Sequence, residues 1–468
     1  MVAGGDFTVE VLRRSVVSAP LPLQEHWLPQ SNLDLLLPPL DFGVFFCYRK
    51  PTPEGSSLGD APSKSLKAAL AESLISFYVL AGEVVSNQVG EPELLCNNRG
   101  VEFVEARANV ELVDLELYNP DESVEGKLVP KKKQGVVAVQ VTELKCGGLV
   151  VGCAFDHRVT DAYSANMFIV SWAEIARSSS SSSPPVLASP SFRRSLLNPR
   201  RPLSIDPYFD QMYVPITSMP KPPDTVPDRH QLMSRIYYVT SHELEELQHV
   251  ATSEEADCKR SKLESFSAFL WKILSNCYEE DSRGRINGTD TTSIIGIVVD
   301  GRTRLGEGKG TFDSYFGNVL SIPFGEMRIA DAVSNPLSKV ADEVHKFLGH
   351  GTSGDHFRGL IDWVETRRPQ PGLTKVYCRT SEDGPAFVVS SGQRFPASKA
   401  DFGWGKPVFG SYHFPWGGTT GYIMPMPSLS VEGDWVVYMH VSKYQVEYIE
   451  REAPNFFKPL TPSYLFPK

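Results

Sequence analysis

The 468-residue chain lacks the segments that would insert it into a membrane or direct it out of the cell. No apolar run approaches the roughly 20 residues that span a bilayer. The N-terminal sequence MVAGGDFTVEVLRRS has no apolar core of a secretory signal, and the C-terminal sequence LFPK matches no lipidation or peroxisomal signal. We therefore expect a cytoplasmic protein without a membrane partner.

Cysteine is scarce, and basic residues are outnumbered by acidic ones. The seven cysteines include no CxxC pair and no Cys/His spacing typical of a metal site, so we expect free thiols and no bound metal. Lys and Arg number 46 against 56 Asp and Glu, which gives a net charge of -10. Because a general nucleic-acid binder needs a surplus of Lys and Arg to neutralise phosphates, this balance argues against a nucleic-acid partner.

The signatures of several common enzyme classes are also missing. The chain has no GxSxG nucleophile elbow and no HExxH helix, so covalent serine hydrolysis and zinc proteolysis lose their usual supports. GEGKGT at residues 306–311 imitates a phosphate-binding loop but lacks its GK[ST] ending, and GGDF at residues 4–7 has no strand beside it. Neither segment predicts nucleotide chemistry.

Length and composition predict two domains. A chain of 468 residues is too long for one compact core. Residues 178–228 begin with six serines and continue as Pro-rich sequence without periodicity, which is typical of a linker. We expect an N-terminal domain over residues 1–177, a crossover over 178–228 and a C-terminal domain over 229–468.

Both halves mix strands and helices. Val137, Val139 and Val141 alternate with small or polar residues, which predicts a half-buried strand over residues 135–144. Strands are also expected over residues 149–155, 235–239, 293–300 and 435–441, and helices over 161–176, from Thr240 onward and around 266–274. These elements do not alternate as regularly as in a TIM barrel or a Rossmann fold, so the predicted fold class is α/β of the α+β type.

An HxxxD sequence places His157 where chemistry is expected. His157 follows the predicted strand over residues 149–155 and precedes the predicted helix over 161–176, at a strand end that a rigid scaffold would hold. A positioned imidazole can remove the proton of an alcohol as a general base. The alternative is a surface histidine near a helix N-terminus, with Asp161 stabilising the positive end of the helix dipole.

Two segments of the C-terminal half carry further candidate residues. In DFGWGKP, residues 401–407, glycines flank Trp404, which indicates a backbone bent where side chains would not fit. The alternative is a glycine-rich loop around a buried aromatic side chain. DGRTR, residues 300–304, follows an apolar strand and either forms a solvated turn or supplies a guanidinium to a buried carboxylate.

Taken together, the HxxxD, DFGWG and DGRTR segments resemble those of the plant BAHD acyltransferase family. The resemblance extends over almost the whole chain. Its other segments are SNLDLLLPPLD (31–41), FYVLAGEV (77–84), ELLCNNRGVEFVEA (93–106), PSFRRS (190–195), ESFSAFLWK (264–272) and YFGN (315–318). It implies two chloramphenicol-acetyltransferase-like domains, each a mixed sheet flanked by helices, with a solvent channel through their interface.

The same resemblance implies roles for individual residues. His157 is expected to be the general base in the channel, with the acceptor entering from one face and the CoA thioester from the other. Asp161 is expected to turn away from the substrate, pair with Arg302 and support the loop. The remaining expected site residues are Asp401 as a second catalytic residue, Trp404 as structural support, Ser390 or Ser391 as a donor to the oxyanion, and Lys262 and Ser265 as contacts of the CoA phosphates.

The implied reaction is direct transfer of an acyl group from acyl-CoA to a small alcohol, by a monomer without a permanently bound cofactor. Residues 78–101 and 155–174 resemble most the coniferyl alcohol acyltransferase branch, which implies acetyl-CoA as the donor and coniferyl alcohol as the acceptor. Gly392 and Ser398 stand where bulkier residues are frequent in the family, which would reshape the acceptor side. The alternatives are hydroxycinnamoyl transfer to shikimate, quinate or another phenolic alcohol or amine, hydrolysis of acyl-CoA, and a catalytically silent binding protein.

Overall fold

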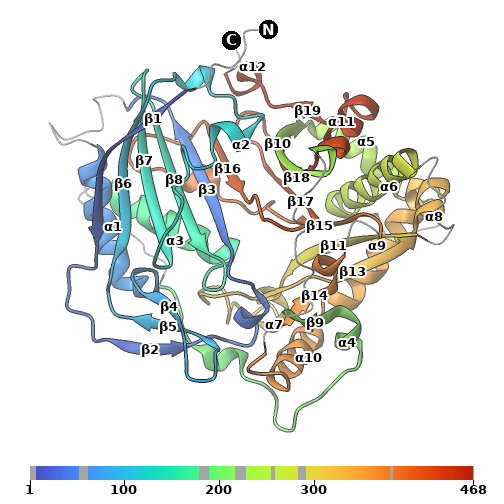
Figure 1. The fold of residues 1–468 in the computed structure, drawn as a ribbon, viewed down its shortest axis with the longest axis horizontal. Coiled ribbons are helices and arrows are strands. Elements are labelled where there is room, and N and C mark those ends of the chain that lie inside the picture. The colour runs from blue at the N-terminus through green and yellow to red at the C-terminus, as the bar shows by residue number, and fades with distance from the viewer. Residues whose placement is uncertain are drawn as a thin grey trace.

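Two large β-sheets stand side by side in the computed structural model (Figure 1). The structure describes residues 7–51, 62–178, 189–216, 228–253, 259–282, 291–370, 372–379 and 383–466. Most of the serine run, most of the GGDF segment and Cys258 lie outside these residues. Mixed sheets with helices beside them confirm the predicted fold class.

The N-terminal sheet has six strands in the order β1-β6-β7-β8-β3-β16. β6 and β7 are parallel, and the other neighbours are antiparallel. Helices α1 (Pro62–Ser76) and α3 (Ala162–Ser178) pack together, and Trp172 Nε1 donates to the Leu66 carbonyl at 3.0 Å. The strands are β1 (Val9–Val17), β3 (Asp41–Tyr48), β6 (Val101–Ala108), β7 (Val137–Leu144), β8 (Leu149–Asp156) and β16 (Phe409–His413).

The C-terminal sheet has eight strands, of which β12-β11-β15-β17-β18-β10-β19 form one path while β13 pairs with β11. Its strands are β10 (Leu232–Val239), β11 (Thr292–Asp300), β12 (Leu320–Ser321), β13 (Phe324–Arg328), β15 (Ala386–Ser390), β17 (Gly421–Pro427), β18 (Trp435–Ser442) and β19 (Lys458–Pro459). Helices on its outer side in Figure 1 are α5 (Ser241–Ala251), α6 (Lys262–Ser282), α8 (Ile329–Ser334), α9 (Leu337–Gly351) and α11 (Lys443–Glu452). One apolar core joins this sheet to α5, α6, α9 and α11.

Smaller elements complete the fold. A three-stranded sheet has the order β2-β5-β4, and a two-stranded sheet pairs β14 with β9. These strands are β2 (His26–Pro29), β4 (Glu83–Ser86), β5 (Pro92–Cys96), β9 (Tyr213–Pro215) and β14 (Gly372–Thr374). The short helices are α2 (Pro120–Ser123), α4 (Tyr208–Met212), α7 (Arg302–Leu305) and α12 (Pro462–Leu465), and α10 (Gly354–Glu365) is longer.

The prediction that β7 is half-buried is wrong, because both of its faces are covered. Ala138, Gln140 and Thr142, expected to face solvent, are all buried. Gln140 Nε2 donates to the Lys127 carbonyl at 2.5 Å and to Thr142 Oγ1 at 2.9 Å. The segment that contains Lys127 therefore covers the second face, and it satisfies the polar groups that the alternating pattern places there.

The helical patterns of the C-terminal half are confirmed. α5 begins at the predicted capping box, in which Thr240 accepts from the Glu243 amide and Glu243 accepts from the Thr240 amide. α6 buries Phe266, Leu270 and Leu274 on one face, as their spacing predicts. Local sequence is therefore sufficient to place these two helices.

One strand of the predicted C-terminal domain belongs to the N-terminal sheet. β16 pairs with β3, with Phe409 opposite Cys47 and His413 opposite Gly43. The chain thus returns to the first sheet after building most of the second. The division into residues 1–177, 178–228 and 229–468 stays a prediction.

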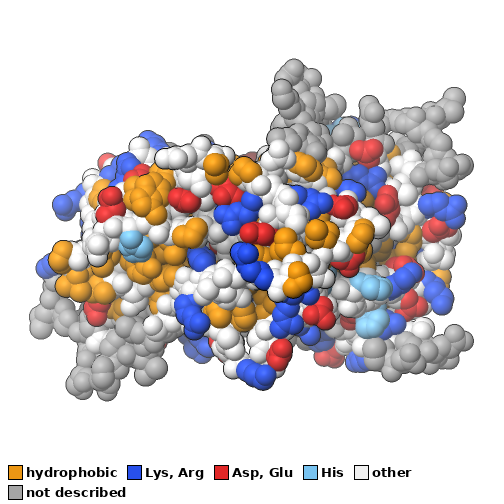
Figure 2. Space-filling view, turned by 90° about the horizontal axis from the view of Figure 1, so that it is seen from below, with side chains coloured by type: hydrophobic (Ala, Val, Ile, Leu, Met, Phe, Trp, Pro, Cys, Tyr) orange, Lys and Arg blue, Asp and Glu red, His pale blue; other side chains and the backbone are white. Residues whose placement is uncertain are grey.

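The described part of the chain shows three further features that bear on function. None of its helices is both long and apolar enough to cross a membrane. Within the same part, no three His, Cys, Asp or Glu side chains are grouped closely enough to hold a metal ion. Figure 2 shows acidic and basic side chains interspersed over the face seen from below, so neither sign of charge dominates that face.

Candidate active site

His157 lies in the turn between β8 and α3, and its backbone is held from both sides. β8 ends one residue earlier, and α3 begins at Ala162. The His157 amide donates to the Leu40 carbonyl at 2.8 Å. The His157 carbonyl accepts from Asn318 Nδ2 at 2.9 Å. One segment from each half of the chain therefore fixes the position of His157.

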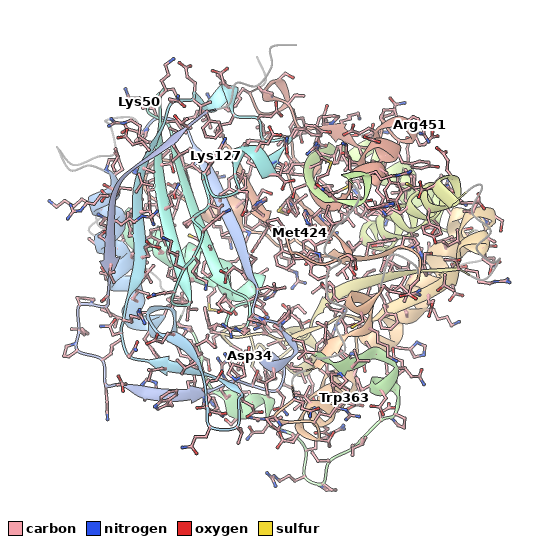
Figure 3. All side chains as sticks on the ribbon, viewed as in Figure 1. Asp34, Lys50, Lys127, Trp363, Met424 and Arg451 are labelled. Atoms are coloured by element: carbon pink, nitrogen blue, oxygen red, sulfur yellow. The ribbon has the colours of Figure 1, made fainter. Side chains whose placement is uncertain are left out.

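Asn318 is held in turn by Asp34, a buried carboxylate that lies between the two sheets (Figure 3). Asp34 Oδ1 accepts from the Asn318 amide at 2.7 Å and from Asn318 Nδ2 at 3.0 Å. Asp34 Oδ2 accepts from the Ser31 amide at 2.9 Å and from Ser31 Oγ at 2.7 Å. Neither Asn318 nor Asp34 has a role in the sequence-based predictions. The sequence does contain a signal for them, because Asp34 in SNLDLLLPPLD and Asn318 in YFGN are polar residues within largely apolar segments.

Asp161 and Arg302 form the predicted ion pair. Arg302 Nη1 donates to Asp161 Oδ2 at 2.7 Å, and Nη2 donates to Asp161 Oδ1 at 3.1 Å. Arg302 is 2% exposed, Asp161 is fully buried, and Nη2 also donates to the Gly317 carbonyl at 2.7 Å. Burial alone would lower the pKa of Arg302, but the charges of Asp161 and Asp300 raise it above its ordinary value. The pair connects the start of α3 to α7.

The carboxylate of Asp161 has further partners within the protein. Its Oδ1 accepts from the Ser164 amide at 2.9 Å, in the first turn of α3. Its Oδ2 accepts from the Val319 amide at 3.2 Å. Both oxygens are therefore bound to protein donors, and this geometry favours a positioning role over proton transfer.

Two aromatic rings enclose the imidazole of His157. Phe42 and Phe414 lie edge-on to it, with ring centroids at 5.0 Å and 6.2 Å. Burial lowers the pKa of His157, and it outweighs the nearby backbone groups and the carboxylates of Asp161 and Asp156, which act in the opposite direction. Nδ1 is buried, whereas no described residue forms a hydrogen bond with Nε2, on a side chain that lines a cavity. A neutral imidazole with an open nitrogen is the form that accepts a proton.

His157 lines a cavity of about 2340 Å³ to which both large sheets contribute. From the N-terminal half come side chains of β3, the His157 turn and α3, and from the C-terminal half come side chains of β11, β15, β17 and β18. Pockets for a single drug-sized ligand measure roughly 300–1000 Å³, so this cavity has room for two substrates together.

The other predicted polar contacts divide into two groups. Ser390, at the end of β15, and Ser391 line the cavity. Ser265 does not, because it is buried in α6 and its hydroxyl donates to the Ser261 carbonyl at 2.9 Å. Lys262 Nζ lies 3.4 Å from a Glu245 oxygen and is also absent from the described lining. Contact of Lys262 and Ser265 with CoA stays a prediction that this geometry does not favour.

The DFGWG loop is organised by its own contacts. Asp401 Oδ1 accepts from the amides of Gly403 and Gly405, both at 2.9 Å, and these glycines have left-handed φ angles of 99° and 91°. Trp404 packs edge-on against Tyr48, with ring centroids 5.5 Å apart. Neither Asp401 nor Trp404 is among the described residues that line the cavity. A catalytic role for Asp401 stays a prediction, and its contacts favour support of the loop.

The sequence of this chain is similar to those of known plant acyltransferases over most of its length. The model of the Transferase family matches residues 7–455. A hydroxycinnamoyltransferase of Narcissus pseudonarcissus is 30% identical over 412 residues, which are 84% of this chain and 87% of that protein. The shikimate O-hydroxycinnamoyltransferase of Nicotiana tabacum is 29% identical over 86% of this chain and 89% of its own length. Putrescine hydroxycinnamoyltransferase 1 of Oryza sativa subsp. japonica is 28% identical, with shares of 86% and 88%.

Solved structures share the fold. Vinorine synthase is similar with a TM-score of 0.71 at 20% identity, over 98% of this chain and 100% of that chain. F. graminearum TRI101 complexed with coenzyme A and T-2 mycotoxin is similar with a TM-score of 0.70 at 15% identity, over 92% and 98%. These likenesses confirm the expected fold of two sheet-containing halves. The chain belongs to the Transferase family as a BAHD acyltransferase, an enzyme that depends on acyl-CoA for the group it transfers.

Proposed function

We propose that this protein transfers a hydroxycinnamoyl group from its CoA thioester to a hydroxyl of a small acceptor, with His157 as the general base. The observation that carries the proposal is the open Nε2 of a rigidly held imidazole, in a cavity with room for both substrates. The donor class is supported by the three relatives, all of which are hydroxycinnamoyltransferases by name.

In the proposed reaction, His157 Nε2 takes the proton of the acceptor hydroxyl while the oxygen attacks the thioester carbonyl. Such a base contributes roughly 10²–10⁴-fold to the rate. The tetrahedral intermediate then collapses, the C–S bond breaks, and the CoA thiolate leaves as the thiol after it takes the proton from His157. Ser390 or Ser391, in the cavity wall, is the proposed hydrogen-bond donor to the oxyanion.

The charged side chains of the cavity wall suit substrates with several polar groups. Arg304, Arg394 and Lys399 line the cavity and are exposed, so they are available to phosphate or carboxylate groups. Glu174 and Asp313 also line it, and their negative charge suits a cationic amine. Because one relative is a putrescine hydroxycinnamoyltransferase, an amine is the second candidate acceptor. Acetyl transfer to coniferyl alcohol is the weaker proposal, since none of these three relatives is named for it.

A donor-by-acceptor screen with the purified protein tests the proposal. p-Coumaroyl-CoA, caffeoyl-CoA and acetyl-CoA are each combined with shikimate, coniferyl alcohol and putrescine, and products are identified by mass spectrometry while free thiol is measured. We expect a hydroxycinnamoyl ester as the main product. Transfer of acetyl alone would overturn the donor assignment, and thiol release that needs no acceptor would identify a hydrolase.

His157→Ala tests the base. We expect kcat to fall roughly 10²–10⁴-fold because the acceptor hydroxyl loses its proton acceptor. The matched control is His242→Ala, since His242 is an exposed histidine of α5 outside the described cavity lining. Circular dichroism checks that both variants keep the fold. Wild-type turnover by a folded His157→Ala protein would remove His157 from the mechanism.

The proposal includes the organisation of the protein. We propose that it acts as a cytoplasmic monomer. We also propose that residues 1–177 and 229–468 form its two domains, with 178–228 as the crossover. Two separate large sheets support this division, and among the strands of the described residues β16 alone is exchanged between the halves.

A further inference from the structure

We propose that Tyr422 recognises the ring hydroxyl of the hydroxycinnamoyl donor, an inference that rests on the proposed function. Tyr422 lies on β17, is half-buried and lines the cavity that contains His157. Met424, two residues further along the same strand, lies near the centre of the molecule between the two sheets in Figure 3. Because alternate residues of a strand face the same side, Tyr422 faces the same central space.

Aromatic contacts connect Tyr422 to the imidazole. The Tyr422 ring packs edge-on against Phe414, with centroids 5.0 Å apart, and Phe414 packs edge-on against His157 at 6.2 Å. One ring therefore stands between the phenol of Tyr422 and the base. This position suits the far end of an aromatic acyl group whose thioester carbonyl lies at His157.

The hydroxyl of Tyr422 interacts with two described side chains, those of Met424 and Ser390. It donates to Met424 Sδ at 3.7 Å, and a thioether sulfur is a poor acceptor. Burial raises the pKa of Tyr422 to about 12 against the opposing effect of the Ser390 side chain, so the phenol stays protonated at neutral pH. A ligand oxygen that replaces the sulfur would therefore receive a better hydrogen bond from Tyr422 than the Met424 sulfur does.

The neighbours of Tyr422 determine which chemical group would bind. In the sheet register Tyr422 lies opposite His440 on β18 and beside Val388 on β15. His440 Nδ1 lies 3.0 Å from Ser234 Oγ, and burial lowers the pKa of His440 to about 4, so its ring is neutral at neutral pH. A carboxylate or phosphate would find no cation in this register. A phenolic hydroxyl finds the hydroxyl of Tyr422 as its hydrogen-bond partner.

The test compares p-coumaroyl-CoA with cinnamoyl-CoA, which differ only in the ring hydroxyl, at a saturating concentration of the best acceptor from the screen. We expect the wild-type protein to prefer p-coumaroyl-CoA in kcat/KM. Tyr422→Phe should reduce this preference roughly three- to tenfold, the factor of one neutral hydrogen bond, while kcat/KM for cinnamoyl-CoA stays unchanged. The matched control is Tyr278→Phe, which removes the same oxygen from a cavity-lining tyrosine of α6 and should keep the preference.

Each outcome decides between roles. An equal loss of kcat/KM for both donors would assign Tyr422 to packing or to the oxyanion and overturn the inference. A preference that survives Tyr422→Phe would overturn it as well, with the proposed function intact. If the wild-type protein transfers neither acyl group, both the proposed function and the inference are wrong. Failure of the proposed function is therefore distinguishable from failure of the inference alone.

Discussion

Replacing Arg302 with methionine should destabilise the protein by about 3 kcal/mol, at the low end of the cost of breaking a buried ion pair. Methionine keeps an apolar stem but removes the guanidinium, which leaves the fully buried Asp161 without its cation. The loss stays at the low end because the amides of Ser164 and Val319 still donate to the carboxylate. Urea unfolding followed by tryptophan fluorescence measures the change.

Two further variants show whether burial is the cause. Arg451→Met removes an exposed arginine at the outer surface of Figure 3, paired with Glu280 and Glu452 at 2.7 Å, and should not change the unfolding midpoint. The double variant Asp161→Asn, Arg302→Met removes both buried charges and should be more stable than Arg302→Met alone. A loss below about 1 kcal/mol for Arg302→Met, typical of a surface pair, would refute the reasoning.

Two other predictions concern the loop residue and the base. Asp401→Ala should lower the free energy of unfolding by about 1–3 kcal/mol, because two loop amides lose their acceptor. We expect kcat to stay unchanged. A large loss of kcat at unchanged stability would instead assign Asp401 a chemical role. The acid limb of the kcat/KM profile should lie below pH 6.5, because the base must be neutral and burial lowers the pKa of His157 from 6.5. Steady-state assays over a range of pH measure this limb. A limb at or above pH 6.5 would contradict the buried environment of His157.

Local patterns in the sequence predicted what local interactions determine. The capping box of Thr240 and Glu243 and the buried face that includes Phe266 depend on residues a few positions apart, and both are present. The pairing of Asp161 with Arg302 spans 141 positions and came from the family resemblance of two motifs, not from periodicity. Distance along the chain therefore separates what patterns can predict from what only a resemblance can.

The features that were not predicted depend on contacts between remote segments. The alternating pattern of β7 does not reveal that the segment containing Lys127 covers the second face of the strand. Likewise, β16 is too short for its pattern to show that it pairs with β3. Asn318 lies 161 positions from His157 and 284 from Asp34, so their hydrogen bonds exist only once both halves have folded. Sequence periodicity carries no information on such pairs.

The same remote contacts explain how a single nitrogen becomes available for chemistry. A buried polar group is costly unless it has a hydrogen-bond partner, and around His157 the backbone amide and carbonyl both have one. Leu40 and Asn318 supply these partners, and the Asp161–Arg302 pair fixes the next turn. The open Nε2 is then held in place by groups that belong to different halves. A base built in this way exists only while the two halves are joined, so the stability of their junction and the rate of transfer should decline together in variants that weaken it.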